Sequence, residues 1–268
     1  MCDRNALVPA LVVALAACGS SPPVTPDGAV LDAHVPDGRA DAPLDAPEKP
    51  PLDFTCRNQP PPATAPDPLL VGGKLFAIEH YQVAALAGAT VVLRRRANDA
   101  PIAQAQTAAD GAFEMSVASG GAPVDGYFTI DAPGFAPSRI DPGDPLFDGE
   151  GPLLAVATGD EMARWYADAG LPATGTGAIL TATVDCANDA GRGATLALAP
   201  PAALAYYDDV AQRWDPALAA SENGFALVAR TATSFTATTS IEATTYPART
   251  VAAPAGTLSI TRLTPRAR

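Results

Sequence analysis

From residue 69 to the C-terminus, hydrophobic and polar positions alternate in short runs, each closed by Gly, Pro, Asn or Asp. This pattern predicts β-strands separated by turns. Asp110-Gly111 predicts a tight hairpin between strands 102–107 and 112–117, since Asp-Gly supplies the positive-φ positions that such a turn needs. The other strands are expected at 69–78, 89–95, 127–130, 152–158, 178–185, 193–198, 222–228, 233–239, 245–251 and 257–263.

One segment departs from this alternation and predicts a short helix over Asp160–Gly170. Gly159 or Asp160 caps its start, acidic residues fill its first turn, and Gly170 ends it. We expect this helix, within residues 159–171, to connect two β-rich halves.

The first residues carry a different pattern, an apolar run of 12 residues from Ala6 to Ala17. A membrane-spanning helix needs about 20 apolar residues, so the run suits the core of a signal peptide. The run ends in Leu15-Ala16-Ala17-Cys18, which resembles the lipobox of bacterial lipoproteins. The resemblance implies removal of residues 1–17 and a membrane anchor through a lipid on Cys18. The alternative is a buried N-terminal helix with an ordinary cysteine, which the following Gly-Ser-Ser-Pro-Pro opposes.

Two features near Cys18 bear on where the protein is anchored and on how typical its signal peptide is. By the same family resemblance, Gly19 after the cysteine favours the outer membrane over the inner membrane of the cell envelope. Asp3 offsets Arg4, which leaves the N-terminal region less basic than in a typical signal peptide.

Residues 18–68 differ in composition from the rest of the chain, with many prolines and aspartates and loose Asp-Ala-Pro repeats. Such a segment buries too little apolar surface to offset its chain entropy, so we expect a disordered, extended tether. Its spaced aspartates could also suggest calcium ligands, but they match no EF-hand loop.

The segments 88–93, 107–113 and 127–135 together resemble the carboxypeptidase regulatory-like domain, over about residues 71–140. Ala108 and Phe135 depart from the family pattern, which has Asp and Tyr there. The resemblance implies an all-β, Greek-key, prealbumin-like β-sandwich without catalytic residues, over residues 69–158. A weaker echo of the same order of strands predicts a second such module over residues 172–268.

The cysteine count predicts one disulfide. Cys2 leaves with the signal peptide and Cys18 carries the lipid, so Cys56 and Cys186 remain. Outside the cytosol such a pair usually forms a bond.

Charge and motifs argue against several functions. A net charge of −12 is unsuited to nucleic acid or an anionic membrane face. Of the two histidines, His34 lies in the tether, and His80 has no zinc motif around it. The sequence contains no nucleophile elbow and no phosphate-binding loop. We therefore expect no enzyme and no cofactor.

Two segments are candidates for binding. The loop 141–150 gathers four carboxylates that could hold calcium, or it is a solvated acidic turn. Tyr206, Tyr207 and Trp214 lie beside acidic residues and could stack on sugars, or they are core rings.

The expected function is that of a lipid-anchored, non-catalytic envelope protein for adhesion, scaffolding or protein binding. The alternative is a carbohydrate- or calcium-binding module that serves a separate enzyme. The sequence does not identify the protein or glycan partner.

Overall fold

The computed structural model describes residues 51–149, 151–172, 177–229, 232–252 and 254–267. These residues form β-strands and one short helix, which confirms the predicted fold class. The strands of the first half are β1 (Leu69–Glu79), β2 (Gln82–Ala85), β3 (Thr90–Arg95), β4 (Pro101–Gln106), β5 (Ala112–Val117), β6 (Gly126–Asp131), β7 (Ser138–Asp141) and β8 (Leu154–Ala157). After α1 (Gly159–Asp168) come β9 (Gly177–Thr183), β10 (Ala194–Ala199), β11 (Leu204–Asp208), β12 (Arg213–Asp215), β13 (Phe225–Val228), β14 (Ser234–Ile241), β15 (Thr244–Thr245), β16 (Arg249–Ala252) and β17 (Thr257–Leu263).

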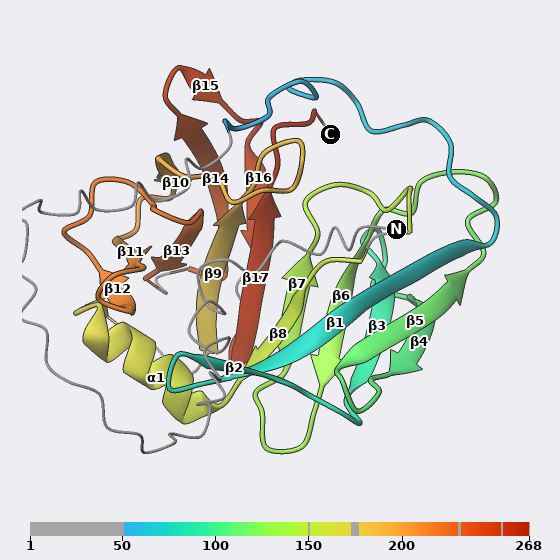
Figure 1. The fold of residues 1–268 in the computed structure, drawn as a ribbon, viewed down its shortest axis with the longest axis horizontal. Helices are drawn as coiled ribbons and strands as arrows, with labels where there is room; N and C mark the ends of the chain where they lie inside the picture. The colour runs from blue at the N-terminus through green and yellow to red at the C-terminus, as the bar shows by residue number, and fades with distance from the viewer. Residues whose placement is uncertain (1–50, 150, 173–176, 230–231, 253, 268) are drawn as a thin grey trace, which may run out of the picture.

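Three sheets build the body of the protein. The largest has nine strands in the order β12-β11-β13-β9-β17-β7-β6-β3-β4 and runs through both halves of the chain (Figure 1). A second sheet groups β2, β5 and β8 around β1, and a third groups β10, β15 and β16 around β14. Each smaller sheet therefore packs on a different part of the large one.

The two halves use the same pairing scheme for most of their strands. β1 pairs antiparallel with β5 and parallel with β8, and β9 pairs in the same two ways with β13 and β17. The series β3-β6-β7 is matched by β10-β14-β16. The two halves differ in the strand that follows β3 or β10. In the first half this strand, β4, pairs with β3, whereas in the second half β11 pairs with β13 and not with β10.

The halves are joined through β17, which lies between β9 and β7 and is parallel to both. Its register places Leu258 opposite Ser138 and Ile260 opposite Ile140. Main-chain hydrogen bonds thus continue from one sandwich into the other. The connection between the halves is a shared sheet in addition to the predicted helix α1.

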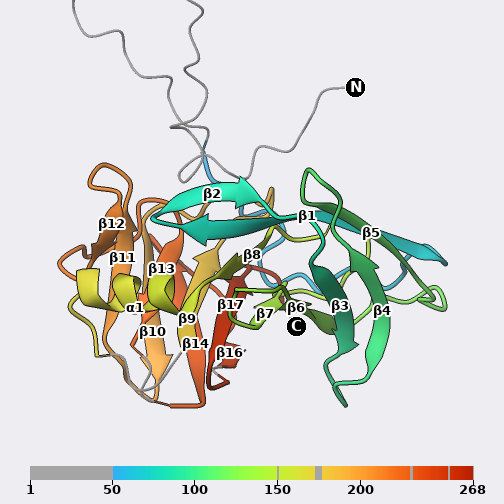
Figure 2. The same ribbon diagram turned by 90° about the horizontal axis from the view of Figure 1, so that it is seen from below.

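The large sheet is covered along one face and half covered along the other. On the covered face, the β1 sheet packs over residues such as Phe128, and α1 packs through Trp165 over residues such as Leu180. On the opposite face, β14 and β16 cover the second half through Phe235 and Val251. The same face of β3, β6 and β7 carries half-buried and exposed side chains, apart from the buried Tyr127 and Asp141. Figure 2 shows no sheet covering this face below β3 and β4.

The hairpin predicted between 102–107 and 112–117 is wrong in its pairing. The turn forms, since Ala108 N–H donates to the Ala112 carbonyl over 2.8 Å and Gly111 has a φ of +75°. The strands then diverge, because β4 pairs with β3 and β5 pairs with β1 in the opposite sheet. Turn residues set the local bend, whereas distant partners set the pairing. The strand predicted at 245–251 is also divided into β15 and β16, with Pro247 between them.

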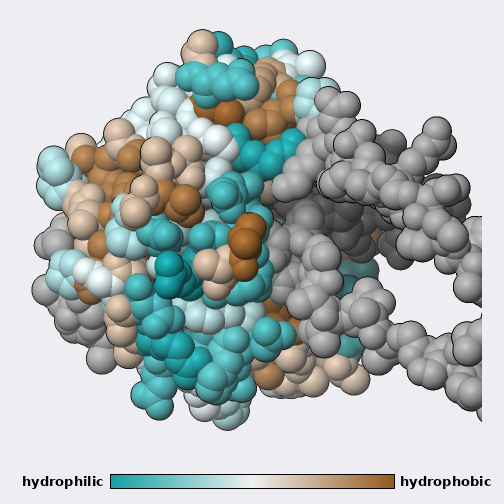
Figure 3. Space-filling model, turned by 60° about the vertical axis from the view of Figure 1, so that its left-hand side comes forward, coloured by the Kyte–Doolittle hydropathy of each residue, from teal (hydrophilic) through white to brown (hydrophobic). Residues whose placement is uncertain are grey.

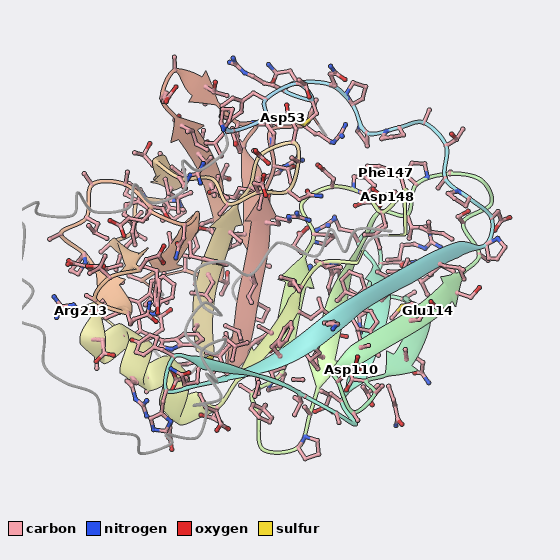
Figure 4. All side chains as sticks on the ribbon, viewed as in Figure 1. Asp53, Asp110, Glu114, Phe147, Asp148 and Arg213 are labelled. Atoms are coloured by element: carbon pink, nitrogen blue, oxygen red, sulfur yellow. A yellow bond between two sulfur atoms is a disulfide. The ribbon has the colours of Figure 1, made fainter. Side chains whose placement is uncertain are left out.

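Residues 51–68 form a strap that is bound to both halves, although their composition predicts a disordered tether. At the second half, Asp53 N–H donates to an Asp185 carboxylate oxygen over 2.7 Å. At the first half, Ser119 Oγ donates to the Pro66 carbonyl over 2.6 Å. Figure 1 shows this blue segment crossing from one half to the other, and Figure 4 marks Asp53 at its start. Specific partners hold this segment in place where composition alone would leave it free.

Cys56 and Cys186 form the predicted disulfide, with their Cα atoms 5.6 Å apart. The bond joins the strap to the end of β9 and closes a loop with a sequence separation of 130 residues. Residues 1–50, and Cys18 with them, lie outside the described residues. No helix within the described part of the chain is long and apolar enough to cross a membrane.

Replacing both cysteines, as Cys56→Ser with Cys186→Ser, should lower the free energy of unfolding by about 3–5 kcal/mol, because a long loop is no longer closed in the unfolded chain. Urea titration followed by tryptophan fluorescence measures this change. The reduced wild-type protein should match the double variant. A loss below about 1 kcal/mol would show that the strap is held without the bond.

Candidate functional site

The uncovered face of β3, β6 and β7 contains a groove of about 480 Å³. Pro254, between β16 and β17, and Thr257, the first residue of β17, line the groove as well, where the covered half begins. Polar and apolar side chains of the three strands line the groove together, and the polar ones include Thr90, Arg94, Thr129, Asp131 and Arg139.

Strand register places two arginines of the groove around one tyrosine. Arg94 on β3 lies opposite Tyr127 on β6, and its Nε donates to Thr129 Oγ1 over 3.1 Å. The Arg139 guanidinium lies over the Tyr127 ring, 3.4 Å from the ring centroid. A second Arg94 nitrogen donates to the Asp99 carbonyl over 3.0 Å. Both guanidinium groups are therefore held in place on the surface of the sheet.

The tyrosine between them is kept neutral. Tyr127 is only 3% exposed, and its hydroxyl donates to Asp99 Oδ1 over 2.7 Å. Burial and then this hydrogen bond raise the pKa of Tyr127, against the opposing charge of Arg139. The phenol thus supports the arginines and does not act as an acid there.

The arginines of this face differ in their partners. Arg96 forms ion pairs with Asp125, at 2.9 Å, and with Asp141. Among the described residues, Arg94 and Arg139 form no ion pair with a carboxylate. The groove therefore holds two arginines without a direct ion pair, together with one carboxylate, that of Asp131.

A second polar cluster surrounds Glu161 on α1, which is 2% exposed. Its carboxylate accepts hydrogen bonds from His80 N–H at 2.8 Å, Tyr81 N–H at 3.2 Å and Trp165 Nε1 at 2.9 Å. His80 and Tyr81 have φ values of +51° and +60° in the β1–β2 turn. Glu161 thus fixes a strained turn of the first half against the helix.

The position of His80 bears on catalysis. Its backbone N–H is bound by Glu161, and its side chain is exposed at the turn. His34 lies outside the described residues. Within the described segments, no three His, Cys, Asp or Glu side chains are placed to hold a metal ion.

The aromatic segment predicted as a possible sugar platform is part of the core. Tyr206, Tyr207 and Trp214 are each at most 5% exposed. Trp214 packs edge-on against Tyr207 and Trp165, with ring centroids 5.3 and 6.3 Å away. Tyr207 and Trp214 point inward because the β11–β12 hairpin lies beneath α1, whereas Tyr206 faces the other side of the sheet, where its hydroxyl accepts from Leu196 N–H over 2.8 Å. On the side that bears α1 and β12, hydrophobic and hydrophilic residues intermingle at the surface (Figure 3).

The carboxylates of the acidic loop are directed to different arginines. Asp141 pairs with Arg96, with one oxygen at 2.8 Å, whereas Asp144 pairs with Arg249 at 3.0 Å. Figure 4 shows Asp148 further along the same loop, and residue 150 lies outside the described part. Asp141 and Asp144 therefore have partners other than a shared cation, and the calcium interpretation receives no support from them.

Sequence reasoning missed the groove. Arg94 was visible at an outward position of an alternating strand, and Arg139 follows a turn by a few residues. Their proximity depends on the β3-β6-β7 order, which local patterns do not reveal.

Comparisons with known proteins found solved structures of low sequence identity and no match to a family model or a curated protein. Among solved structures, a double mutant of the shaft pilin SpaA from Lactobacillus rhamnosus GG is similar, with 11% identity, 75% of this chain and 98% of that chain covered, and a TM-score of 0.24. The BSP domain of a biofilm-associated protein is similar at 12% identity, covering 76% of this chain and 29% of that one, with a TM-score of 0.22. At such scores the fold assignment rests on the strands and sheets described above.

Replacing Glu161 with Gln should lower the free energy of unfolding by about 2–3 kcal/mol. The amide is uncharged, and its NH2 group would face the N–H donors that the carboxylate now accepts from. Chemical denaturation measures the loss. Glu114→Gln is the matched control, since Glu114 is exposed on the outer face of β5 (Figure 4). We expect it to change the stability by no more than about 0.5 kcal/mol. Equal effects of the two substitutions would contradict a special role for Glu161.

The protein should lose stability steeply at alkaline pH. Burial is the largest cause that raises the pKa of Tyr81, Tyr127, Tyr206, Tyr207 and Tyr246, and for Tyr207 the value is about 12. A raised folded-state pKa gives stability that is present below the ordinary tyrosine pKa of about 10 and is lost as the pH rises above it.

Urea midpoints measured from pH 8 to pH 11.5 test this expectation. Tyr207→Phe should show a shallower decline above about pH 10, because one titrating group is gone. A wild-type midpoint that stays constant over this range, or an unchanged slope in the variant, would refute it.

Proposed function

We propose that this protein is a lipid-anchored protein of the cell envelope, whose two β-sandwich modules form a rigid, non-catalytic body for adhesion, scaffolding or protein binding. The observation that carries the proposal is the nine-stranded sheet shared by both halves and reinforced by the disulfide-bonded strap. Such a body suits the presentation of a surface, because its parts are fixed relative to one another by hydrogen bonds and a covalent bond.

The environment of the buried charges supports a non-catalytic role. Glu161 binds three N–H groups, and Asp185 accepts hydrogen bonds from the N–H groups of Asp53, Ala187 and Asp189. Asp144 pairs with Arg249. These groups maintain the fold, whereas catalytic groups have to face a substrate.

The lipid anchor and the modular division belong to the same proposal. Lipidation of Cys18 after removal of residues 1–17 rests on the lipobox resemblance, and outer-membrane placement rests on Gly19. The disulfide favours an oxidising compartment. The matched pairing schemes of the two halves support a repeated module, one over residues 69–158 and one over 172–268, with the helix region 159–171 between them.

A carbohydrate-binding accessory role is the second candidate function. The groove on the uncovered face favours it, since polar side chains and two arginines line a concave surface there.

A radiolabelled fatty acid supplied to expressing bacteria should be incorporated into the wild-type protein and not into Cys18→Ser. The reason is that the thiol at Cys18 is the expected acceptor of the lipid. The labelled wild-type protein should be found in the membrane fraction, whereas the Cys18→Ser protein should be found outside that fraction.

Cys2→Ser is the matched control, because it removes a cysteine from the same N-terminal segment and should leave labelling unchanged. Equal labelling of wild type and Cys18→Ser would overturn the anchor, as would complete absence of label from the wild-type protein.

A further inference from the structure

We propose that the groove on the uncovered face of β3, β6 and β7 binds a short glycan through a sugar that bears a carboxylate, with Arg94 and Arg139 as the carboxylate-binding residues. This inference goes beyond the anchoring and scaffolding role by naming a ligand class. It rests on residues far from Cys18 in the sequence, so it is tested separately from the anchor.

The first argument is charge. The chain carries a net charge of −12, yet the groove contains two arginines against one carboxylate, Asp131. Neither arginine forms a direct ion pair among the described residues. Arginine presents a planar set of donors that matches the two oxygens of a carboxylate. A ligand carboxylate between Arg94 and Arg139 would also relieve the repulsion between them.

The second argument is preorganisation. Arg94 is held by hydrogen bonds to Thr129 and Asp99, and Arg139 is held against the ring of Tyr127. Side chains that are already fixed lose little conformational entropy when a ligand binds. The two guanidinium groups are therefore already positioned before a ligand binds.

The third argument concerns the rest of the lining. Thr90, Thr129 and Asp131 offer hydroxyl and carboxylate groups that can exchange hydrogen bonds with sugar hydroxyls. A bound peptide would need partners for its main-chain groups, and the face of a sheet presents side chains and not free main-chain donors. A volume of about 480 Å³ falls in the range of small-ligand sites.

The fourth argument limits the length of the ligand. A long polyanion would be repelled by the overall negative charge of the protein. A glycan with one or two carboxylates meets the local positive charge and little of that repulsion.

The test is isothermal titration of the full-length chain in detergent with digalacturonate. Its dimethyl ester, in which both carboxylates are esterified, is the neutral control ligand. We expect binding of digalacturonate and at least about tenfold weaker binding of the ester, because the ester loses charge-assisted hydrogen bonds.

Arg139→Gln and Arg94→Gln should each weaken binding of digalacturonate by about tenfold or more. Arg213→Gln is the matched control, since it removes the same charge from an exposed position on β12, in the other half of the protein (Figure 4). It should leave binding unchanged. Val92→Glu adds an acidic group to the groove and should abolish binding, and it provides a second variant if the arginine variants do not fold.

Three outcomes would overturn the proposal: no heat of binding with digalacturonate, equal binding of the ester, or unchanged binding by a folded Val92→Glu variant. Loss of binding in Arg213→Gln equal to that in Arg139→Gln would also do so, because it would show a non-specific charge effect. None of these results depends on whether Cys18 is lipidated.

Discussion

Parallel hydrogen bonding of β17 to β9 on one side and to β7 on the other determines how the two halves of the protein meet. Without β17, β7 and β9 would each present an unpaired strand edge, which is a common starting point for aggregation. β17 follows the other strands of the described residues, so the shared sheet is complete only when residues 257–263 are in place. The relative position of the sandwiches is thus a property of main-chain pairing and not of a flexible connection.

Three side-chain contacts support this junction on the covered face. Glu161 binds the main chain of the β1–β2 turn, and Tyr81 from that turn packs against Tyr207 with ring centroids 6.0 Å apart. The Tyr81 hydroxyl also donates to Asp168 at the end of α1 over 2.6 Å. The first half therefore contributes to the core beneath the helix of the second, and the strap crosses the junction from outside. Covalent, polar and apolar contacts all act across the same boundary.

The features of this arrangement that depend on neighbouring residues could be predicted from the sequence. Alternation located most strands, and the acidic first turn with the closing Gly170 located α1, because both depend on neighbouring residues. The predicted N-cap was wrong, since Thr158 and not Gly159 or Asp160 caps the helix, with its hydroxyl accepting from Glu161 N–H over 3.1 Å. The disulfide followed from a count of cysteines. The pairing of β5 with β1, the ordered strap and the groove could not be derived, since each depends on residues far apart in the sequence. Tyr207 and Trp214 show the same limit, because a ring beside carboxylates has the same pattern whether it is exposed or buried.

The uncovered face is a consequence of the same junction. The smaller sheet around β14 covers the large sheet only beyond β17, so the first half keeps one face without a covering layer. A bare sheet face is stable in water when its outward positions are polar, and β3 and β6 place arginine, threonine and aspartate there. Arg139 shields the one large ring on that face, Tyr127, and keeps its positive charge at the surface. Arg94 and Arg139 therefore make this face compatible with solvent and also give the groove its positive charge.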